Sequence, residues 1–243
     1  MPFNMQNRIQ ILSTRPLHET LLQEAKQAGI DIDELSFIQT TPIQSISIQK
    51  EIDEAILQSI TTIFTSMNAV EVVASQIKEK KTSWKIYCIG TTTQQLVVKY
   101  FGQDAVIGTA NDAAALAKLI VEEQPKGKLI FFCGDQRRDE LPEILQQNSL
   151  EVKEIIVYQT TTLKHSIQKL YDGILFFSPS GVESFFCNNQ LSEKTILFAI
   201  GNTTAKEIKK HSDNQIVISD QPGKEKLASK MIDFFNQKLN NSI

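Results

Sequence analysis

The feature that most constrains the fold of this chain is an internal repeat. Residues 62–73 read TIFTSMNAVEVV, and residues 174–186 read ILFFSPSGVESFF. Each stretch is an apolar run that reaches a serine, Ser66 or Ser178, and then takes on the apolar spacing of a helix. The two serines lie 112 positions apart (178 − 66). This pattern predicts two copies of one unit, in which a buried strand leads into a helix.

The repeat extends to three further pairs of segments. They are residues 85–102 with 196–212, 105–120 with 216–235, and 128–145 with 8–22. The last pair breaks the order, because its unit comes last in the central half of the chain and first in the outer half. The simplest explanation is a duplicated α/β domain in which one copy is inserted into the other.

Repeated strand–helix units predict parallel sheets that are covered by helices on both faces. We therefore expect an α/β fold of two doubly wound, flavodoxin-like domains, joined by a two-stranded β connector that is rich in β-branched residues. The expected boundaries are 1–37 with 163–243 for the discontinuous domain, 42–154 for the inserted domain, and 38–41 with 155–162 for the connector strands.

Composition narrows the choice of partners and of compartment. The chain of 243 residues has a net charge of −3, so it carries no overall basic field and nucleic acid is not an expected partner. No apolar run approaches the ~18 residues that a membrane span needs. The N-terminal residues lack the apolar core of a secretory signal. We therefore expect a cytoplasmic protein that does not contact a membrane.

The cysteines and histidines do not suggest a metal or redox centre. Cys88, Cys133 and Cys187 show no C-x-x-C spacing, and the three histidines are scattered. We expect buried, free thiols in a reducing compartment. The chain also lacks the glycine-rich dinucleotide fingerprint, the phosphate-binding P-loop and the serine nucleophile elbow. No cofactor and no metal ion are expected.

Hydroxyl side chains gather where the expected strands end and helices begin. Ligands of open α/β sheets bind at these carboxyl ends of the strands. One interpretation is helix capping, and the other is anion binding by the free N–H groups of a helix N-terminus. Both remain open, because a capping turn can also face a ligand. The candidate residues are Ser66, Thr91, Thr92, Thr93, Ser178, Ser180, Thr203 and Thr204.

The arginines point to a carboxylate ligand. The chain has only four, Arg8, Arg15, Arg137 and Arg138, and three of them fall in turns between a strand and a helix. A guanidinium group is suited to holding a carboxylate through two hydrogen bonds. For Arg137 and Arg138 the alternative is a surface ion pair, since acidic residues lie on either side. Arg15 is the arginine that we expect to contact a ligand.

The segments, in their order and spacing, resemble the uroporphyrinogen-III synthase family over nearly the whole chain. Any one of them is a weak signal, but together they are specific. The segments are STRP at 13–16, FTSMNAV at 64–70, IGTTT at 89–93, GDQRRDEL at 134–141, VYQT at 157–160, FFSPSGV at 176–182 and AIGNTTA at 199–205.

The resemblance implies a HemD-like fold of two α/β domains and one reaction. Linear hydroxymethylbilane, which carries eight carboxylates, would lose water and cyclise with inversion of ring D to give uroporphyrinogen III, without a metal ion or cofactor. The functionally important tyrosine of the family matches Tyr158. Its cleft hydroxyls match Ser66, Thr93, Ser180 and Thr203 or Thr204, and Ser178 is added on position alone. A monomer would suffice for this activity.

Two other classes of protein remain possible at this point. A non-enzymatic two-domain clamp for a small polyanion would also suit nested α/β domains with capped turns. It would bind an anion tightly without turnover. A regulatory relative that has lost the activity usually carries a fused effector domain, and no residues here are left over for one. The VYQT segment and the paired hydroxyl turns favour the synthase.

Overall fold

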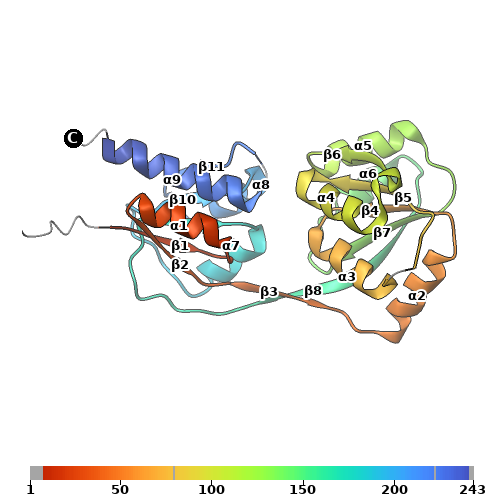
Figure 1. Ribbon diagram of the computed structural model, residues 1–243, viewed down its shortest axis with the longest axis horizontal. Coiled ribbons are helices and arrows are strands. Elements are labelled where there is room, and N and C mark those ends of the chain that lie inside the picture. Colours follow the sequence, from red (N-terminus) through yellow and green to blue (C-terminus); the bar gives the residue numbers. More distant parts are fainter. Residues whose placement is uncertain (1–7, 79, 222, 241–243) are drawn as a thin grey trace, which may run out of the picture. The chain divides into compact units, whose positions relative to one another are not determined.

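The structure of the protein is a computed structural model that describes residues 8–78, 80–221 and 223–240. It confirms an α/β fold with two predominantly parallel sheets (Figure 1). Contacts divide the chain into two compact units. The continuous unit comprises Thr40–Thr161, and the discontinuous unit comprises the residues up to Gln39 together with those from Thr162 onward.

The continuous unit contains a sheet with the strand order β3-β8-β7-β4-β5-β6. Its strands are β3 (Ile38–Pro42), β4 (Thr61–Phe64), β5 (Lys85–Ile89), β6 (Val106–Ala110), β7 (Leu129–Gly134) and β8 (Val152–Thr162). Its helices are α2 (Ile46–Ile56), α3 (Met67–Ile77), α4 (Gly90–Phe101), α5 (Ala113–Glu123) and α6 (Glu140–Gln147), with a short 3-10 turn at Gln103–Ala105. Buried side chains place α2, α3 and α4 against one face of the sheet and α5 and α6 against the other.

The discontinuous unit contains a sheet with the order β11-β10-β9-β1-β2. Its strands are β1 (Ile9–Ser13), β2 (Ile30–Glu34), β9 (Gly173–Phe176), β10 (Ile196–Ala199) and β11 (Ile216–Ile218). Its helices are α1 (Glu19–Gln27), α7 (Pro179–Phe186), α8 (Asn202–Ile208) and α9 (Lys224–Asn240). Buried side chains of α1 and α9 pack on one face, and those of α7 and α8 pack on the other.

The two sheets repeat one topology, as the sequence pairs predict. The order β6-β5-β4-β7-β8 in one unit corresponds to β11-β10-β9-β1-β2 in the other. Every pairing between consecutive members of these two series is parallel. The out-of-order pair is explained as well, because β7 and β1 hold the same central position although they come from different places along the chain.

The chain passes between the two units through β3 and β8, which are neighbours in the sheet. Two hydrogen bonds that join these segments run from Leu163 N to Phe37 O at 2.8 Å and from Ile43 N to Val157 O at 2.9 Å. The residue numbers rise on one strand as they fall on the other, so the two strands run antiparallel. Among the described residues no helix is long and apolar enough to cross a membrane.

The cysteines depart in part from the sequence prediction. Cys88 on β5 and Cys133 on β7 are buried, but Cys187 is exposed, so the prediction of three buried thiols is wrong for Cys187. The apolar face of α7 is formed by Val182 and Phe185, three residues apart. Cys187 follows the last residue of α7 on a different side of the helix, because successive helical residues are rotated by about 100°.

We expect one thiol of the folded protein to react rapidly with an aromatic disulfide reagent at neutral pH. Burial raises the pKa of Cys88 and of Cys133 to about 11, which keeps both in the unreactive thiol form. Colorimetric titration should give one fast equivalent in buffer and three in denaturant. The Cys187→Ser variant should lose the fast equivalent, and a second fast equivalent in the native protein would contradict the burial of Cys88 and Cys133.

Candidate functional site

The serines of the opening repeat occupy equivalent positions in the two units. Ser66 follows β4 and is the N-cap of α3, where its Oγ accepts a hydrogen bond from the backbone N–H of Asn68 at 3.2 Å. Ser178 follows β9 and is the N-cap of α7, where its Oγ accepts from Gly181 N at 3.2 Å. Capping is therefore confirmed for both serines. It does not exclude contact with a ligand, since N-caps lie at the carboxyl ends of the strands.

Tyr158 of β8 is bonded to the Ser66 cap. Its phenol donates a hydrogen bond to Ser66 Oγ at 3.0 Å. Ser66 Oγ therefore accepts two hydrogen bonds, one from Asn68 N and one from Tyr158, which occupies both of its lone pairs. The remaining hydrogen-bonding capacity of Ser66 is its own O–H group. This hydroxyl is free to donate to a bound ligand.

A β-bulge directs Tyr158 toward α3. In the parallel pairing of β7 with β8, Cys133 lies opposite Ile156, but Gly134 lies opposite Tyr158, so one residue of β8 is left over. Successive side chains of a strand point to opposite faces of the sheet. Without the extra residue, Tyr158 would therefore lie on the other face of the sheet from Val157. Instead both Val157 and Tyr158 pack against the core that lies beneath α3. Bulges of this kind often re-aim a side chain beside a functional site.

A pocket of about 220 Å³ opens beside Tyr158 within the continuous unit. It is lined by Thr40, Pro42, Asn68, Glu71, Val72, Ser75 and Tyr158. Burial raises the pKa of Tyr158, against the opposing effects of its hydrogen bonds with Ser66 and Asn68. The phenol therefore stays protonated at neutral pH and remains a hydrogen-bond donor.

Thr93 lies in the first half of α4, which follows β5. Its side chain is only 6% exposed because it points into the core along with Val97, four residues later. The hydroxyls of Thr91 and Thr92, which precede it, belong to exposed residues. In the IGTTT segment it is thus the first two threonines, rather than Thr93, that present their side chains to solvent.

The remaining predicted residues follow three neighbouring strands of the discontinuous unit. Thr203 and Thr204 lie in the first turn of α8 after β10, and the side chain of Thr204 is buried. Ser180 lies in the first turn of α7 after β9, with its Oγ 3.3 Å from Ser178 Oγ. Arg15 follows β1 and is half-buried. Because β10, β9 and β1 are adjacent and parallel, all these residues lie at one edge of the sheet.

For Arg137 the structure supports the alternative interpretation, which is an ion pair with acidic residues. Its guanidinium group is paired with Asp139, as the sequence suggested, and with Glu154 of β8. The pair with Glu154 was not foreseen, because the two residues come together only through the pairing of β7 with β8. Among the residues that the structure describes, no cluster of histidine, cysteine and acidic side chains could hold a metal ion.

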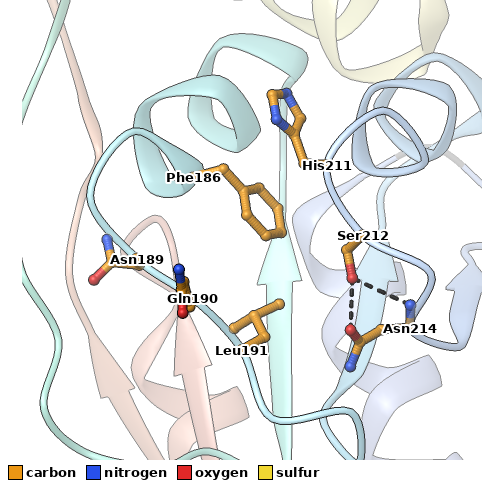
Figure 2. A pocket seen from close by; sticks show the side chains of 7 residues that line it. All are labelled: Phe186, Asn189, Gln190, Leu191, His211, Ser212 and Asn214. Carbon is orange, nitrogen blue, oxygen red and sulfur yellow. Dashed lines mark hydrogen bonds between the residues drawn. The ribbon is translucent and has the colours of Figure 1, made fainter.

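A larger cavity of about 340 Å³ lies elsewhere in the discontinuous unit (Figure 2). It is lined by Phe186, Asn189, Gln190, Leu191, His211, Ser212 and Asn214. These residues come from the ends of α7 and α8 and from the loops that lead into β10 and β11, so the cavity lies at the amino ends of the strands. The Asn214 side chain donates to Ser192 O and Thr195 O, and Ser212 Oγ donates to Asn214. This network holds the loops together, and none of the predicted site residues lines the cavity.

Comparison with known proteins assigns the family. The family model described as Uroporphyrinogen-III synthase HemD matches residues 19–229. The chain belongs to the uroporphyrinogen-III synthase family. This is a family of cyclising lyases of haem biosynthesis, so the non-enzymatic clamp is not favoured.

Individual members of the uroporphyrinogen-III synthase family show the same likeness. The uroporphyrinogen-III synthase of Saccharomyces cerevisiae is 25% identical over 195 residues, which cover 66% of this chain and 70% of that protein. A mutant uroporphyrinogen III synthase from the extremely thermophilic bacterium Thermus thermophilus has a TM-score of 0.64 at 12% identity, covering 96% of this chain and 99% of that one. The uroporphyrinogen-III synthetase of Helicobacter pylori 26695 also has a TM-score of 0.64, at 18% identity, covering 93% and 99%. These two structures support the fold.

Sequence analysis missed Asn68 as a residue of these turns. Asn68 lines the pocket beside Tyr158, and its backbone N–H is the group that Ser66 caps. The signal for Asn68 was its position two residues after an N-cap serine, within the first helical turn. Sequence analysis did name Thr91, Thr92 and Thr93 together, and the signal that distinguishes them is the apolar residue Val97, which places Thr93 on the inner face of α4 and turns its neighbours outward.

Proposed function

We propose that this chain converts hydroxymethylbilane into uroporphyrinogen III, with loss of water and inversion of ring D. The observation that carries the proposal is the match of the family model to residues 19–229. The hydroxyl-rich helix N-termini at the strand ends, together with Arg15, support a ligand that bears many carboxylates.

The proposed chemistry makes modest demands on acid–base groups. The pyrrole nitrogen of ring A gives up its proton and expels the hydroxyl, which leaves with a proton as water, and an electrophilic azafulvene remains. Attack by the substituted α-carbon of ring D forms a spiro intermediate. The older bond from that carbon to the bridge of ring C then breaks, the bridge is captured by the free α-carbon of ring D, and loss of the proton on that carbon restores the pyrrole with ring D inverted. Direct closure in solution gives the uninverted isomer. The protein must therefore favour one folded geometry of the substrate, which is catalysis by positioning and by preferential binding of the transition state.

We assign the departure of the hydroxyl to the pair of Ser66 and Tyr158. Tyr158 donates to Ser66 Oγ, which strengthens the Ser66 O–H as a donor through cooperative hydrogen bonding. The Ser66 hydroxyl then donates to the leaving oxygen of the substrate. The raised pKa of Tyr158 keeps its proton in place, so that the pair remains a hydrogen-bond donor at neutral pH.

We assign binding of the acetate and propionate groups to the turns after the strands. In the discontinuous unit these are the guanidinium group of Arg15, the hydroxyls of Ser178, Ser180 and Thr203, and the first-turn N–H of Thr204. In the continuous unit, the buried Thr93 fixes the first turn of α4, and the exposed hydroxyls of Thr91 and Thr92 meet the substrate. No cofactor takes part in this proposal.

The proposal extends to a monomer in the cytoplasm. Free thiols at Cys88, Cys133 and Cys187 suit a reducing compartment, and one chain carries both sets of turns. A mass by light scattering of about twice the 27.4 kDa of the chain would contradict the monomer.

Analysis of the product isomer tests the function directly. Purified protein supplied with hydroxymethylbilane is expected to yield the type III isomer, separated by chromatography after oxidation to the porphyrin. Buffer alone and heat-denatured protein should yield the type I isomer at the spontaneous rate. If the native protein also gives only type I, at that same rate, the proposed function is wrong.

A further inference from the structure

The ring of Tyr158 lies against the backbone of Gly134, at the end of β7. A Cβ atom built on Gly134 would stand 2.5 Å from Tyr158 Cε2 and 2.7 Å from its phenol oxygen. Carbon atoms in contact are normally about 3.5–4.0 Å apart. Any side chain at position 134 would therefore have to push the ring away by about 1 Å.

The backbone of Gly134 does not itself require glycine. Its φ lies outside the left-handed region, unlike that of Gly90, where φ is +73°. An alanine at position 134 would adopt the same backbone conformation without strain. The ring of Tyr158 is therefore what excludes a side chain there.

Three features together determine where the phenol of Tyr158 lies. The bulge in β8 turns the side chain toward α3, the bare Cα of Gly134 lets the ring approach β7, and Ser66 Oγ holds the hydroxyl at 3.0 Å. A displacement of about 1 Å would stretch that hydrogen bond beyond the roughly 3.5 Å at which it ceases to exist. Its loss would also free the second lone pair of Ser66.

We propose that Gly134 is a positioning residue for the reaction, which acts by admitting the ring of Tyr158 to the place where its phenol reaches Ser66. The inference rests on the proposed role of Tyr158. It assigns Gly134 no contact with the substrate. It predicts that a methyl group at position 134 removes the contribution of the Tyr158 hydroxyl to kcat and has little other effect on the kinetics.

The chain offers a matched control at Gly108 of β6. A Cβ on Gly108 would stand 2.6 Å from Tyr87 Cδ1, and Gly108 lies opposite Tyr87 in the β5–β6 pairing just as Gly134 lies opposite Tyr158. The φ of Gly108 is also outside the left-handed region. The phenol of Tyr87 donates to Glu123 rather than to a helix cap. Alanine at position 108 therefore creates the same kind of collision away from the proposed site.

The test is a double-mutant cycle measured by steady-state kinetics on hydroxymethylbilane. Gly134→Ala is expected to lower kcat about tenfold, as loss of one hydrogen bond worth about 1.4 kcal/mol would do, with KM within about twofold. Added to Tyr158→Phe, it should lower kcat by less than about twofold more, because the hydroxyl is already gone. Gly108→Ala should leave kcat within about twofold of the wild type.

The outcomes separate this inference from the role of Tyr158. If Tyr158→Phe leaves kcat unchanged, the proposed role of Tyr158 fails. Two other outcomes overturn the positioning role of Gly134. In the first, Tyr158→Phe slows turnover but Gly134→Ala changes kcat no more than Gly108→Ala does. In the second, the effects of Gly134→Ala and Tyr158→Phe on kcat simply multiply in the double variant.

A stability measurement keeps the inference testable if Gly134→Ala folds poorly. In a Tyr158→Ala background the colliding ring is absent, so adding Gly134→Ala should shift the midpoint of urea unfolding far less than it does in the wild type. The double variant should then be folded even if the single variant is not. Equal shifts of the midpoint in the two backgrounds would show that the ring is not what excludes a side chain at position 134.

Discussion

Replacement of Phe132 by alanine is expected to lower the free energy of unfolding of the continuous unit by about 3–5 kcal/mol. Phe132 on β7 is fully buried, and its ring stacks on Phe64 and on Trp84 with centroids 5.4 Å and 5.5 Å apart. Removal of the ring deletes buried apolar surface and also leaves a cavity between two rigid aromatic side chains, which cannot collapse into the space.

The single tryptophan of the chain makes this prediction easy to measure. Trp84 touches the deleted ring, so its fluorescence during urea unfolding reports on this core. Leu57→Ala is the matched control, because Leu57 lies in the same unit and is 86% exposed, and its free energy should change by less than about 0.5 kcal/mol. A loss below about 1 kcal/mol for Phe132→Ala would mean that the aromatic stack does not stabilise the unit.

The parts of the fold that the sequence predicted are those that local patterns determine. An apolar run followed by a serine specifies a buried strand and a capped helix within about ten residues, so β4 with α3 and β9 with α7 could be matched residue for residue. The repeat then supplied the topology, because equivalent units take equivalent places in a sheet. The β7 and β1 pair was assigned in this way, although the order of units along the chain differs.

The parts that the sequence did not predict depend on contacts between distant segments. The extra residue in β8 appears only when β8 is set against β7, and the same pairing brings Gly134 under Tyr158 and Glu154 beside Arg137. No spacing within either segment signals these contacts.

The repeat itself also conceals a difference between the two units. Gly90 and Gly201 look equivalent in sequence, but Gly90 has a φ of +73° whereas Gly201 is extended at −177°. The two helix starts are therefore built differently. Gly90 is required by its backbone conformation, whereas the backbone of Gly201 would accept other residues.

The second large effect that we expect is a loss of about tenfold in kcat for Tyr158→Phe, with KM and stability little changed. The substitution keeps the ring that packs on the core and on Gly134 and removes only the hydroxyl that donates to Ser66. One such hydrogen bond contributes about 1.4 kcal/mol, which corresponds to one factor of ten in rate. The helix cap survives, because Ser66 still accepts from Asn68 N.

Tyr171→Phe is the matched control for loss of a phenol. Tyr171 donates to Asp33 at 2.8 Å in the discontinuous unit, within a cluster that also pairs Lys169 with Asp33. Removal of that hydroxyl should leave kcat within about twofold. Steady-state kinetics on the two variants distinguish a catalytic contribution of Tyr158 from a general effect of losing a tyrosine hydroxyl. Equal kcat values for the two variants would contradict the prediction.

The pH profile gives the Tyr158→Phe prediction a second readout. Burial raises the pKa of Tyr158 above the ordinary tyrosine value of about 10, so the phenol is protonated throughout the range from about pH 6 to 9. The ratio of wild-type to variant kcat should therefore be constant across that range. A ratio that falls toward one as the pH rises from 7 to 9 would mean that the phenol ionises there. Tyr158 would then act as an acid with a lowered pKa, which its buried position beside Ser66 does not support.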